Sequence, residues 1–211
     1  MRYFNSLPLL KNTDNYGNTY SLRNLLIRTN LIPQLASNPL LFYQYELREG
    51  DTPETVANKY YGDSYRYWIV LYGNSTILDP QGDWPLTSQQ FTVYLTDKYA
   101  AAANAAANTV LSYCTGTIHH YEKIITTYDD STQSTVVKTV EVDETDYLAI
   151  VPTTQKQKFA NGDTITYSLS KNAVSIYDYE QKLNESKRNI KLINSTYANQ
   201  MENQYQSLVS T

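Results

Sequence analysis

The chain has 211 residues, of which 41% are hydrophobic and 18% charged, and its formal net charge is −4. A chain of this length can bury a core without disulfides or structural metals. Its Lys and Arg residues are scattered and lack the clustered cationic footprint of nucleic-acid binders. No apolar run approaches the ~20 residues that a membrane-spanning helix needs.

Cysteine and tyrosine usage narrows the class of protein. Cys114 is the only cysteine, so an internal disulfide is impossible and a reducing compartment is expected. The first twenty residues lack the apolar core and cleavage site of a secretory signal, which favours synthesis and assembly in a cytoplasm. Tyrosine occurs 21 times and phenylalanine 4 times. Tyrosine suits both half-buried cores and interfaces, and composition leaves both uses open.

Residues 1–40 are predicted to form an N-terminal arm. Ser21 suits the N-cap of a short helix, and two prolines then interrupt the segment. An apolar but interrupted arm of this kind is expected to dock on a surface. The leucines of the short helix are Leu22, Leu25 and Leu26, and the prolines are Pro33 and Pro39.

A strand, a turn and two short helices are predicted between residues 42 and 74. Polar and apolar residues alternate over 42–48, which is typical of a strand. Gly50 supplies a turn, and Asp51 or Thr52 can cap a helix that begins at Pro53. That helix ends at Gly62, and the second ends at Gly73-Asn74. The second helix carries Tyr67, Trp68, Leu71 and Tyr72 at helical spacing.

A third helix is predicted to follow the turn-rich loop after Asn74. Thr87 and Gln90 have the spacing of a capping box, and an alanine-rich segment at 98–112 favours helix strongly. A closing strand over 91–95 is the alternative.

The next segment, 113–170, is predicted to be a small antiparallel sheet because β-branched residues alternate along it. Asp129–Gln133 and Asn161-Gly162 are its expected turns. His119 and His120 are adjacent in a predicted strand. Their side chains should therefore point to opposite faces, where they cannot jointly hold a metal ion.

The C-terminal segment, 171–211, is predicted to be one long helix, since residues 174–209 contain no Gly or Pro. A narrow apolar stripe along it suits packing against one or two partner helices. The alternative is a terminal helix lying on its own domain. The stripe contains Ile176, Leu183, Ile190, Ile193, Tyr197, Met201, Tyr205 and Leu208.

No pattern of catalytic chemistry stands out in the sequence. Metal-binding, phosphate-loop and nucleophile-elbow motifs are missing, and Cys114 is best explained as a small buried hydrophobe. A glycosidase needs two carboxyl groups facing across a cleft, which a sequence cannot display. We therefore expect neither an enzyme nor a cofactor or metal site.

The stretch from Tyr45 to Asn74 resembles the LysM module in its strand and two helices, "YELREGDT", "PETVANKYYG" and "YRYWIVLYGN". LysM modules bind glycans that contain N-acetylglucosamine, and the resemblance places the groove at Gly50, Asp51 and Thr52. The sequence departs from the LysM pattern in a long second loop that carries Trp84. A helix also takes the place expected for the short second strand.

A longer stretch is similar to the baseplate wedge subunit of contractile-tailed phages of the T-even type, which carries a divergent LysM-like domain. A second block, with Asn184, Glu185, Arg188, Ile190, Lys191 and Ile193, approximates the family's C-terminal motif. The first block's matching positions are Pro53, Glu54, Ala57, Asn58, Tyr61, Gly62, Tyr67, Trp68, Asp79, Pro80, Trp84 and Thr87-Ser88-Gln89.

The sequence patterns and this resemblance together predict an α+β protein in which a small LysM-like β-α-α module, implied by the resemblance, is flanked by other elements. These are the arm at 1–40, the module at 41–97, the Ala-rich helix at 98–112, the sheet at 113–170 and the long helix at 171–211.

The resemblance also implies a structural virion protein of the tail baseplate, assembled in the host cytoplasm. It would join neighbouring wedges around the tail hub through contacts with other wedge proteins, an inner sheath-like protein and the hub. Neither nucleic acid nor a membrane is expected as a partner. The alternative is a LysM-type module that binds peptidoglycan or N-acetylglucosamine.

Overall fold

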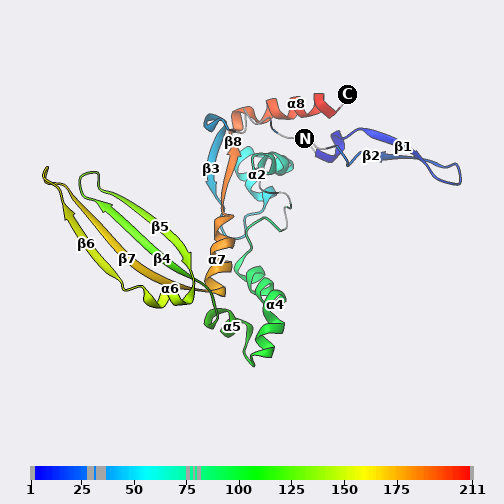
Figure 1. Cartoon of the computed structure of the whole chain (residues 1–211). Coiled ribbons are helices and arrows are strands. Elements are labelled where there is room, and N and C mark those ends of the chain that lie inside the picture. Colours follow the sequence, from blue (N-terminus) through cyan, green and yellow to red (C-terminus); the bar gives the residue numbers. More distant parts are fainter. Residues whose placement is uncertain are drawn as a thin grey trace. The chain divides into compact units, whose positions relative to one another are not determined.

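A computed structural model describes residues 3–27, 31, 37–74, 77, 79 and 82–209. The fold is α+β, with seven α-helices and three antiparallel sheets in the described part of the chain (Figure 1). The chain divides into two units. Unit 1 comprises Met1–Ser88 and Glu185–Thr211, and unit 2 comprises Gln89–Asn184. Unit 2 is therefore inserted into the sequence of unit 1.

The strand and two helices predicted after residue 41 are confirmed. A 3₁₀ turn, η2 (Pro39–Leu41), leads into β3 (Phe42–Glu46), and α2 (Pro53–Tyr61) follows. The Thr52 side chain caps α2 in a capping box, and Gly62 ends the helix in the left-handed conformation, with φ of 73°. A second 3₁₀ turn, η3 (Ser64–Arg66), then leads into α3 (Tyr67–Tyr72). Local caps fix these boundaries, and that is why the sequence reveals them.

The prediction of one long C-terminal helix is wrong. The segment forms α7 (Ile176–Ser186), β8 (Asn189–Ile193), the 3₁₀ turn η4 (Ser195–Tyr197) and α8 (Ala198–Val209). β8 pairs antiparallel with β3, with Tyr45 opposite Ile190. A strand from the C-terminal segment thus stands where the sequence suggested that a helix replaces a second strand. Burial of Ile190 and Leu192 on one face outweighs helix propensity here.

The outer edge of β8 is closed by side chains of unit 1. The Asn74 amide donates to the carbonyl of Lys191 and accepts from its N–H, both at 2.8 Å. The Tyr61 hydroxyl donates to the carbonyl of Ile193 at 2.7 Å. A Cβ at Gly73 would lie 2.7 Å from the Lys191 carbonyl oxygen, so the end of α3 approaches β8 too closely for any side chain there.

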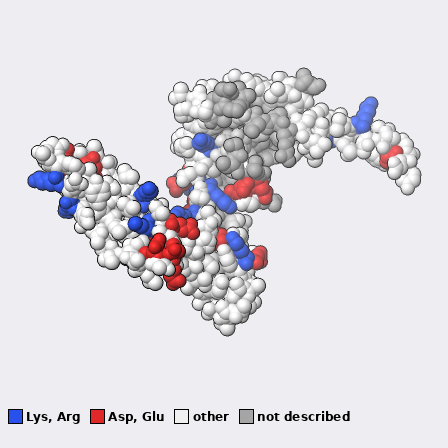
Figure 2. Space-filling view, viewed as in Figure 1, with Lys and Arg blue, Asp and Glu red and all other residues white. Residues whose placement is uncertain are grey.

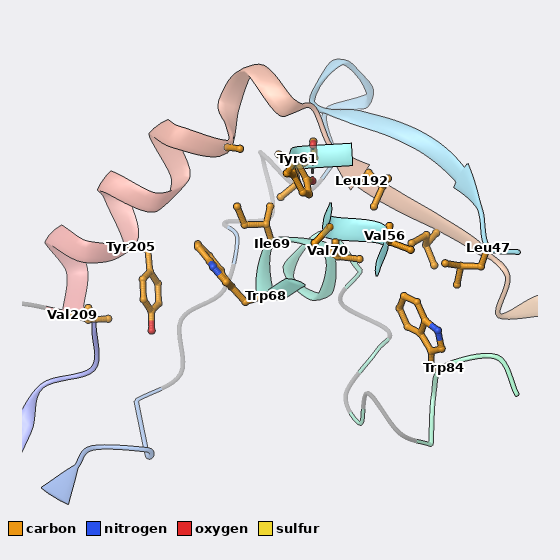
Figure 3. Packing of buried hydrophobic residues seen from close by; sticks show 14 of the residues in the cluster. Leu47, Val56, Tyr61, Trp68, Ile69, Val70, Trp84, Leu192, Tyr205 and Val209 are labelled. Carbon is orange, nitrogen blue, oxygen red and sulfur yellow. Dashed lines mark hydrogen bonds between the residues drawn. The ribbon is translucent and has the colours of Figure 1, made fainter. Parts of the chain in front are cut away.

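The core of unit 1 lies between this two-stranded sheet and the helices (Figure 3). Leu47, Val56, Ile69, Val70 and Leu192 are almost fully buried in it. A second part of the same core is aromatic. There the rings of Trp68 and Tyr205 lie side by side with centroids 5.1 Å apart, and Tyr3 stacks on Tyr205 at 5.0 Å.

The short helix predicted at Ser21 is also wrong. After η1 (Tyr3–Ser6), the chain forms a hairpin of β1 (Leu9–Thr13) and β2 (Thr19–Arg23), so Ser21 lies within a strand. The Asp14 carboxylate accepts the N–H groups of the turn, and this turn chemistry outweighs the leucine spacing. Pro39 begins η2, whereas Pro33 lies outside the described residues.

Unit 2 combines helices with a four-stranded antiparallel sheet. α4 (Ser88–Ala105) begins at the last residue of unit 1, and α5 (Val110–Gly116) follows. The alternative strand at 91–95 is wrong, because those residues lie within α4. The chain turns between the helices at Ala107, which has φ of 51°.

The sheet of unit 2 confirms the predicted antiparallel sheet and both of its turns. Its order is β5-β4-β7-β6. The strands are β4 (Ile118–Asp129), β5 (Ser134–Val142), β6 (Thr153–Lys158) and β7 (Thr164–Ser175), and α6 (Glu144–Ala149) connects β5 to β6. β6 and α6 were not predicted, because "TTQKQK" has no apolar face.

We predict that Gly73→Ala destabilises unit 1 by about 1–3 kcal/mol, because the new methyl group forces α3 away from β8. Urea unfolding followed by tryptophan fluorescence measures this effect, since Trp68 and Trp84 both lie in unit 1.

Gly116→Ala is the matched control, because a Cβ there meets nothing within 4 Å. We expect it to leave stability unchanged or to raise it slightly, measured by circular dichroism. Equal stability of the Gly73→Ala variant and the parent chain would contradict the close-approach argument.

Candidate functional site

The loop predicted as a glycan groove, Gly50 to Thr52, is occupied by internal hydrogen bonds. The buried Asp51 carboxylate accepts the N–H of Arg48 at 3.0 Å and the hydroxyl of Tyr45 at 3.1 Å, and it pairs with the Lys59 ammonium. The Asp51 carbonyl accepts the indole N–H of Trp84 at 2.7 Å. Gly50 has φ of 77° and Thr52 caps α2. The Gly50–Thr52 loop therefore connects β3 to α2 and also binds the long loop that carries Trp84.

The charge of Asp51 is stabilised by these contacts. Burial alone would raise the pKa of the carboxyl group, but the hydrogen bonds from Lys59, Arg48 and Tyr45 outweigh it. The net pKa lies below the ordinary aspartate value. Asp51 is therefore ionised at neutral pH and serves as a structural junction.

The family-motif positions also have structural environments. Pro53 is the first residue of α2, Glu54 lies in its first turn, and the carbonyl of Asn58 accepts the N–H of Gly62 at the C-cap. The N–H of Asp79 donates to the Asp83 carboxylate at 2.9 Å. Five further positions of the first block are buried or partly buried in the core, Ala57, Tyr61, Tyr67, Trp68 and Trp84, whereas Ser88 and Gln89 are exposed. Pro80 lies outside the described residues.

The predicted partner-helix stripe does not form one surface, because its residues belong to four elements. Ile190, Ile193 and Tyr205 are buried in unit 1, with Met201 partly buried beside them. Ile176 is buried in unit 2. The three members with exposed side chains are Leu183, Tyr197 and Leu208.

An open groove lies at β3 and the residues that follow it. Its volume is about 660 Å³, and residues 43–49 line it together with Glu185 and Arg188. The hydrogen bonds at both ends of the β3–β8 pair, Leu47 N–H to Arg188 and Asn194 N–H to Leu41, fix which residues face β8. By alternation, the backbone groups of Gln44 and Glu46 point to the other edge. Within the described part of the chain, neither residue has a hydrogen-bond partner there.

The N-terminal hairpin is a second unusual surface of unit 1. Every residue of β1 and β2 is exposed, although the hairpin carries Leu9, Leu10 and Leu22. An isolated two-stranded hairpin is at best marginally stable in water. This hairpin therefore has the features of an element that docks on another surface.

Besides Glu122 of β4, unit 2 contains a buried carboxylate at Glu180 of α7, which three groups of α4 surround. The carboxylate accepts the hydroxyls of Tyr94 at 2.9 Å and Tyr99 at 2.6 Å and the ammonium of Lys98 at 2.7 Å. Burial alone would raise its pKa, but these donors lower it overall. Burial and the same carboxylate raise the pKa of Tyr99 to about 12. The group is fully hydrogen-bonded and holds α4 against α7.

The two histidines do not follow the expectation for a regular strand. A register shift between Ile118 and His120 distorts β4, and the two Nδ1 atoms of His119 and His120 lie 2.9 Å apart. Among the described residues no group of three His, Cys, Asp or Glu side chains is arranged to hold a metal ion. Cys114 is buried, and burial raises the pKa of its thiol. Both features are typical of a cysteine that packs in a core.

Figure 2 shows Lys and Arg residues interspersed with Asp and Glu on the visible face, without a continuous basic area. Within the described residues, no helix has the length and apolar character to cross a membrane.

The sequence matches a family model described as base plate wedge protein 53 over residues 28–208. The chain belongs to this family. A base plate wedge protein is a structural component of the phage virion tail that contacts other base plate proteins. The hairpin of β1 and β2 lies outside the matched residues. A search of curated proteins gives no match.

Several important residues carried only weak signals in the sequence. Asn74 was identified merely as the end of a helix, yet its amide closes the edge of β8. Glu180 falls in a segment predicted to be helical, and no motif in the sequence marked it as a buried carboxylate. The backbone groups of Gln44 and Glu46 that point away from β8 have no sequence signature. Alternation in "NIKLI" was the one available hint of β8.

We predict that Asp51→Asn destabilises unit 1 by about 2 kcal/mol, because it removes the acceptor charge for Lys59 while Tyr45 and Arg48 remain. Tryptophan fluorescence during urea unfolding measures the loss. Glu54→Gln, which changes an exposed carboxylate, serves as the control. Equal destabilisation by both changes would contradict the role of Asp51 as a junction.

We predict a pH dependence at Glu180. Its folded pKa is lowered, so its stabilisation is full above the unfolded value of about 4.3 and is lost as pH falls through the folded pKa. Glu180→Gln should therefore lower the melting temperature by circular dichroism at pH 7 and have little effect near pH 3. A constant difference across this range would show that the charge of Glu180 is not the cause.

Proposed function

We propose that this chain is a connector of the T-even type in the baseplate of a contractile tail. In this role it joins neighbouring wedges around the tail hub. Its partners are other wedge proteins, the inner sheath-like protein and the hub, and it is assembled into the virion in the host cytoplasm. The observation that carries the proposal is the family match, which spans both units of the chain.

The order of elements in unit 1 supports a LysM-like module as the scaffold of this connector. β3, α2 and α3 follow one another directly, and β8 pairs with β3 after the insertion of unit 2. Strand, helix, helix and strand is the order that the LysM resemblance implies. We therefore assign the module to β3–α3 together with β8, with the arm, the sheet of unit 2 and the terminal helix as its additions.

Internal bonding of the Gly50–Thr52 loop favours a scaffold over a glycan-binding module. The Asp51 side chain is 8% exposed and already has three hydrogen-bond donors. The hydroxyl of Thr52 caps α2. A sugar at this loop would have to displace these contacts, and each lost hydrogen bond to a charged group costs about 1.5–3 kcal/mol.

The test of this function is infection with a phage whose gene for this chain is interrupted. We expect separate wedges in place of joined base plates, seen by sucrose-gradient sedimentation and electron microscopy. The parent chain supplied in trans should restore joining. Joined base plates in the absence of the chain would refute the proposal.

A glycan pull-down separates the alternative function. We expect no retention of the purified chain on insoluble peptidoglycan or chitin. Retention that N-acetylglucosamine oligomers compete away, and that a Thr52→Ala variant loses while it stays folded, would instead support the glycan-binding module.

A further inference from the structure

We propose that β1 of one copy of this chain pairs antiparallel with the open edge of β3 in the next copy. The copies would then be linked head to tail, by hairpin and groove. This inference rests on the proposed function, because it names one contact through which a wedge connector can reach its neighbour.

The receiving edge is defined by its unpaired backbone groups. Gln44 and Glu46 each direct an N–H and a C=O away from β8. The flanking positions already have hydrogen-bond partners. The Arg48 N–H donates to the Asp51 carboxylate, and the Arg48 carbonyl accepts the N–H of Asp51. The Phe42 N–H donates to the carbonyl of Pro39. The edge therefore accepts a short strand in a narrow window.

The donated strand has the complementary backbone pattern. Hydrogen bonds from Asp14 N–H to Asn18 and from Asn24 N–H to Pro8 fix the pairing within the hairpin. By alternation, the backbone groups of Leu9, Lys11 and Thr13 point out of the β1 edge. β1 and β2 pair only with each other among the described residues, so this edge is available.

Two antiparallel registers satisfy both edges, and the charges favour one of them. The favoured register places Lys11 opposite Glu46 and Thr13 opposite Gln44, and all four residues then exchange backbone hydrogen bonds. Lys11 and Glu46 are exposed, and neither has an ion pair within the described residues. Directly opposed opposite charges stabilise a strand pair, whereas like charges destabilise it.

The surrounding charges favour the same pairing. The groove holds Glu46, Glu49 and Glu185 against Arg48 and Arg188, and Arg188 bonds to both Glu49 and Glu185. The groove thus has one excess negative charge. The hairpin has one excess positive charge, since it carries Lys11 and Arg23 against Asp14.

The symmetry of this contact suits a ring of wedges. Hairpin and groove are different surfaces, so the interface is heterologous, and a repeated heterologous contact closes into a ring when its rotation allows. The second copy is therefore a more fitting occupant than an unrelated strand, which would have to match both the register and the charge.

The test uses two complementary variants of the full chain. In the first, Gly-Gly replaces residues 9–23, which is feasible because the Asn24 N–H lies 2.9 Å from the Pro8 carbonyl oxygen and closes the base of the hairpin. In the second, Gln44→Pro removes an N–H that points away from β8, a position where strands tolerate proline. Tryptophan fluorescence verifies that both variants fold.

Sedimentation from about 1 µM to about 1 mM covers the dissociation constants of weak and moderate contacts. We expect the parent chain to self-associate and each variant alone to stay monomeric. An equimolar mixture should form dimers and nothing larger, because only one hairpin and one edge remain per pair. A monomeric parent chain, or dimers of either variant alone, would overturn the proposal.

A charge exchange tests the register. Lys11→Glu should weaken self-association about tenfold, and Lys11→Glu with Glu46→Lys in the same chain should restore it. Failure of the restoration would refute the Lys11–Glu46 register. The two proposals can fail separately. If the parent chain does not self-associate but the phage experiment shows that the chain joins wedges, the strand pairing is refuted and the proposed function stands. If the chain self-associates but base plates form normally in the phage whose gene is interrupted, the proposed function is refuted and the pairing stands.

Discussion

The pairing of the Asn74 amide with the backbone of Lys191 is the contact on which unit 1 depends. These residues lie 117 positions apart, and all of unit 2 lies between them in the sequence. A side-chain amide offers one donor and one acceptor, and here it substitutes for a third strand along the edge of β8. The close approach of α3 that it needs leaves room only for glycine at position 73. Without this contact β3 and β8 would still be paired, but the N–H and C=O of Lys191 on the outer edge of β8 would lose their hydrogen-bond partners.

The two outer edges of the β3–β8 sheet differ in how their backbone groups are hydrogen-bonded. Asn74 and Tyr61 satisfy the outer edge of β8, whereas the backbone groups of Gln44 and Glu46 on the outer edge of β3 have no partner among the described residues. Exposed edges invite pairing with other chains, and proteins usually block them with prolines, charges or covering elements. Retention of one short open edge, next to a groove, is consistent with a protein that works by joining other chains.

The sequence predicts those elements whose ends are fixed locally. β3, α2 and α3 have turn and cap residues at their boundaries, and the sheet of unit 2 alternates over long strands, so these elements were identified correctly. The C-terminal segment was misassigned because Ile176, Leu183, Ile190 and Tyr197 recur every seven residues by coincidence and belong to three elements. β8 is a strand only because β3, more than a hundred residues earlier, is available to pair with it. The hydrogen bonds of Asn74 to the edge of β8 could not be predicted from the sequence either, because they depend on a long-range contact with the backbone.

The hydroxyls of four of the 21 tyrosines perform a similar task. The ring of Tyr61 is buried in the core while its hydroxyl satisfies the carbonyl of Ile193. Tyr45 does the same for Asp51, and Tyr94 and Tyr99 do so for Glu180. Phenylalanine at these positions would preserve the apolar contact but leave a buried carbonyl or carboxylate short of a donor. The abundance of tyrosine therefore reflects, at these sites, polar closure inside each unit rather than surface recognition, and the recognition surfaces are better sought in the exposed backbone of β3 and in the hairpin.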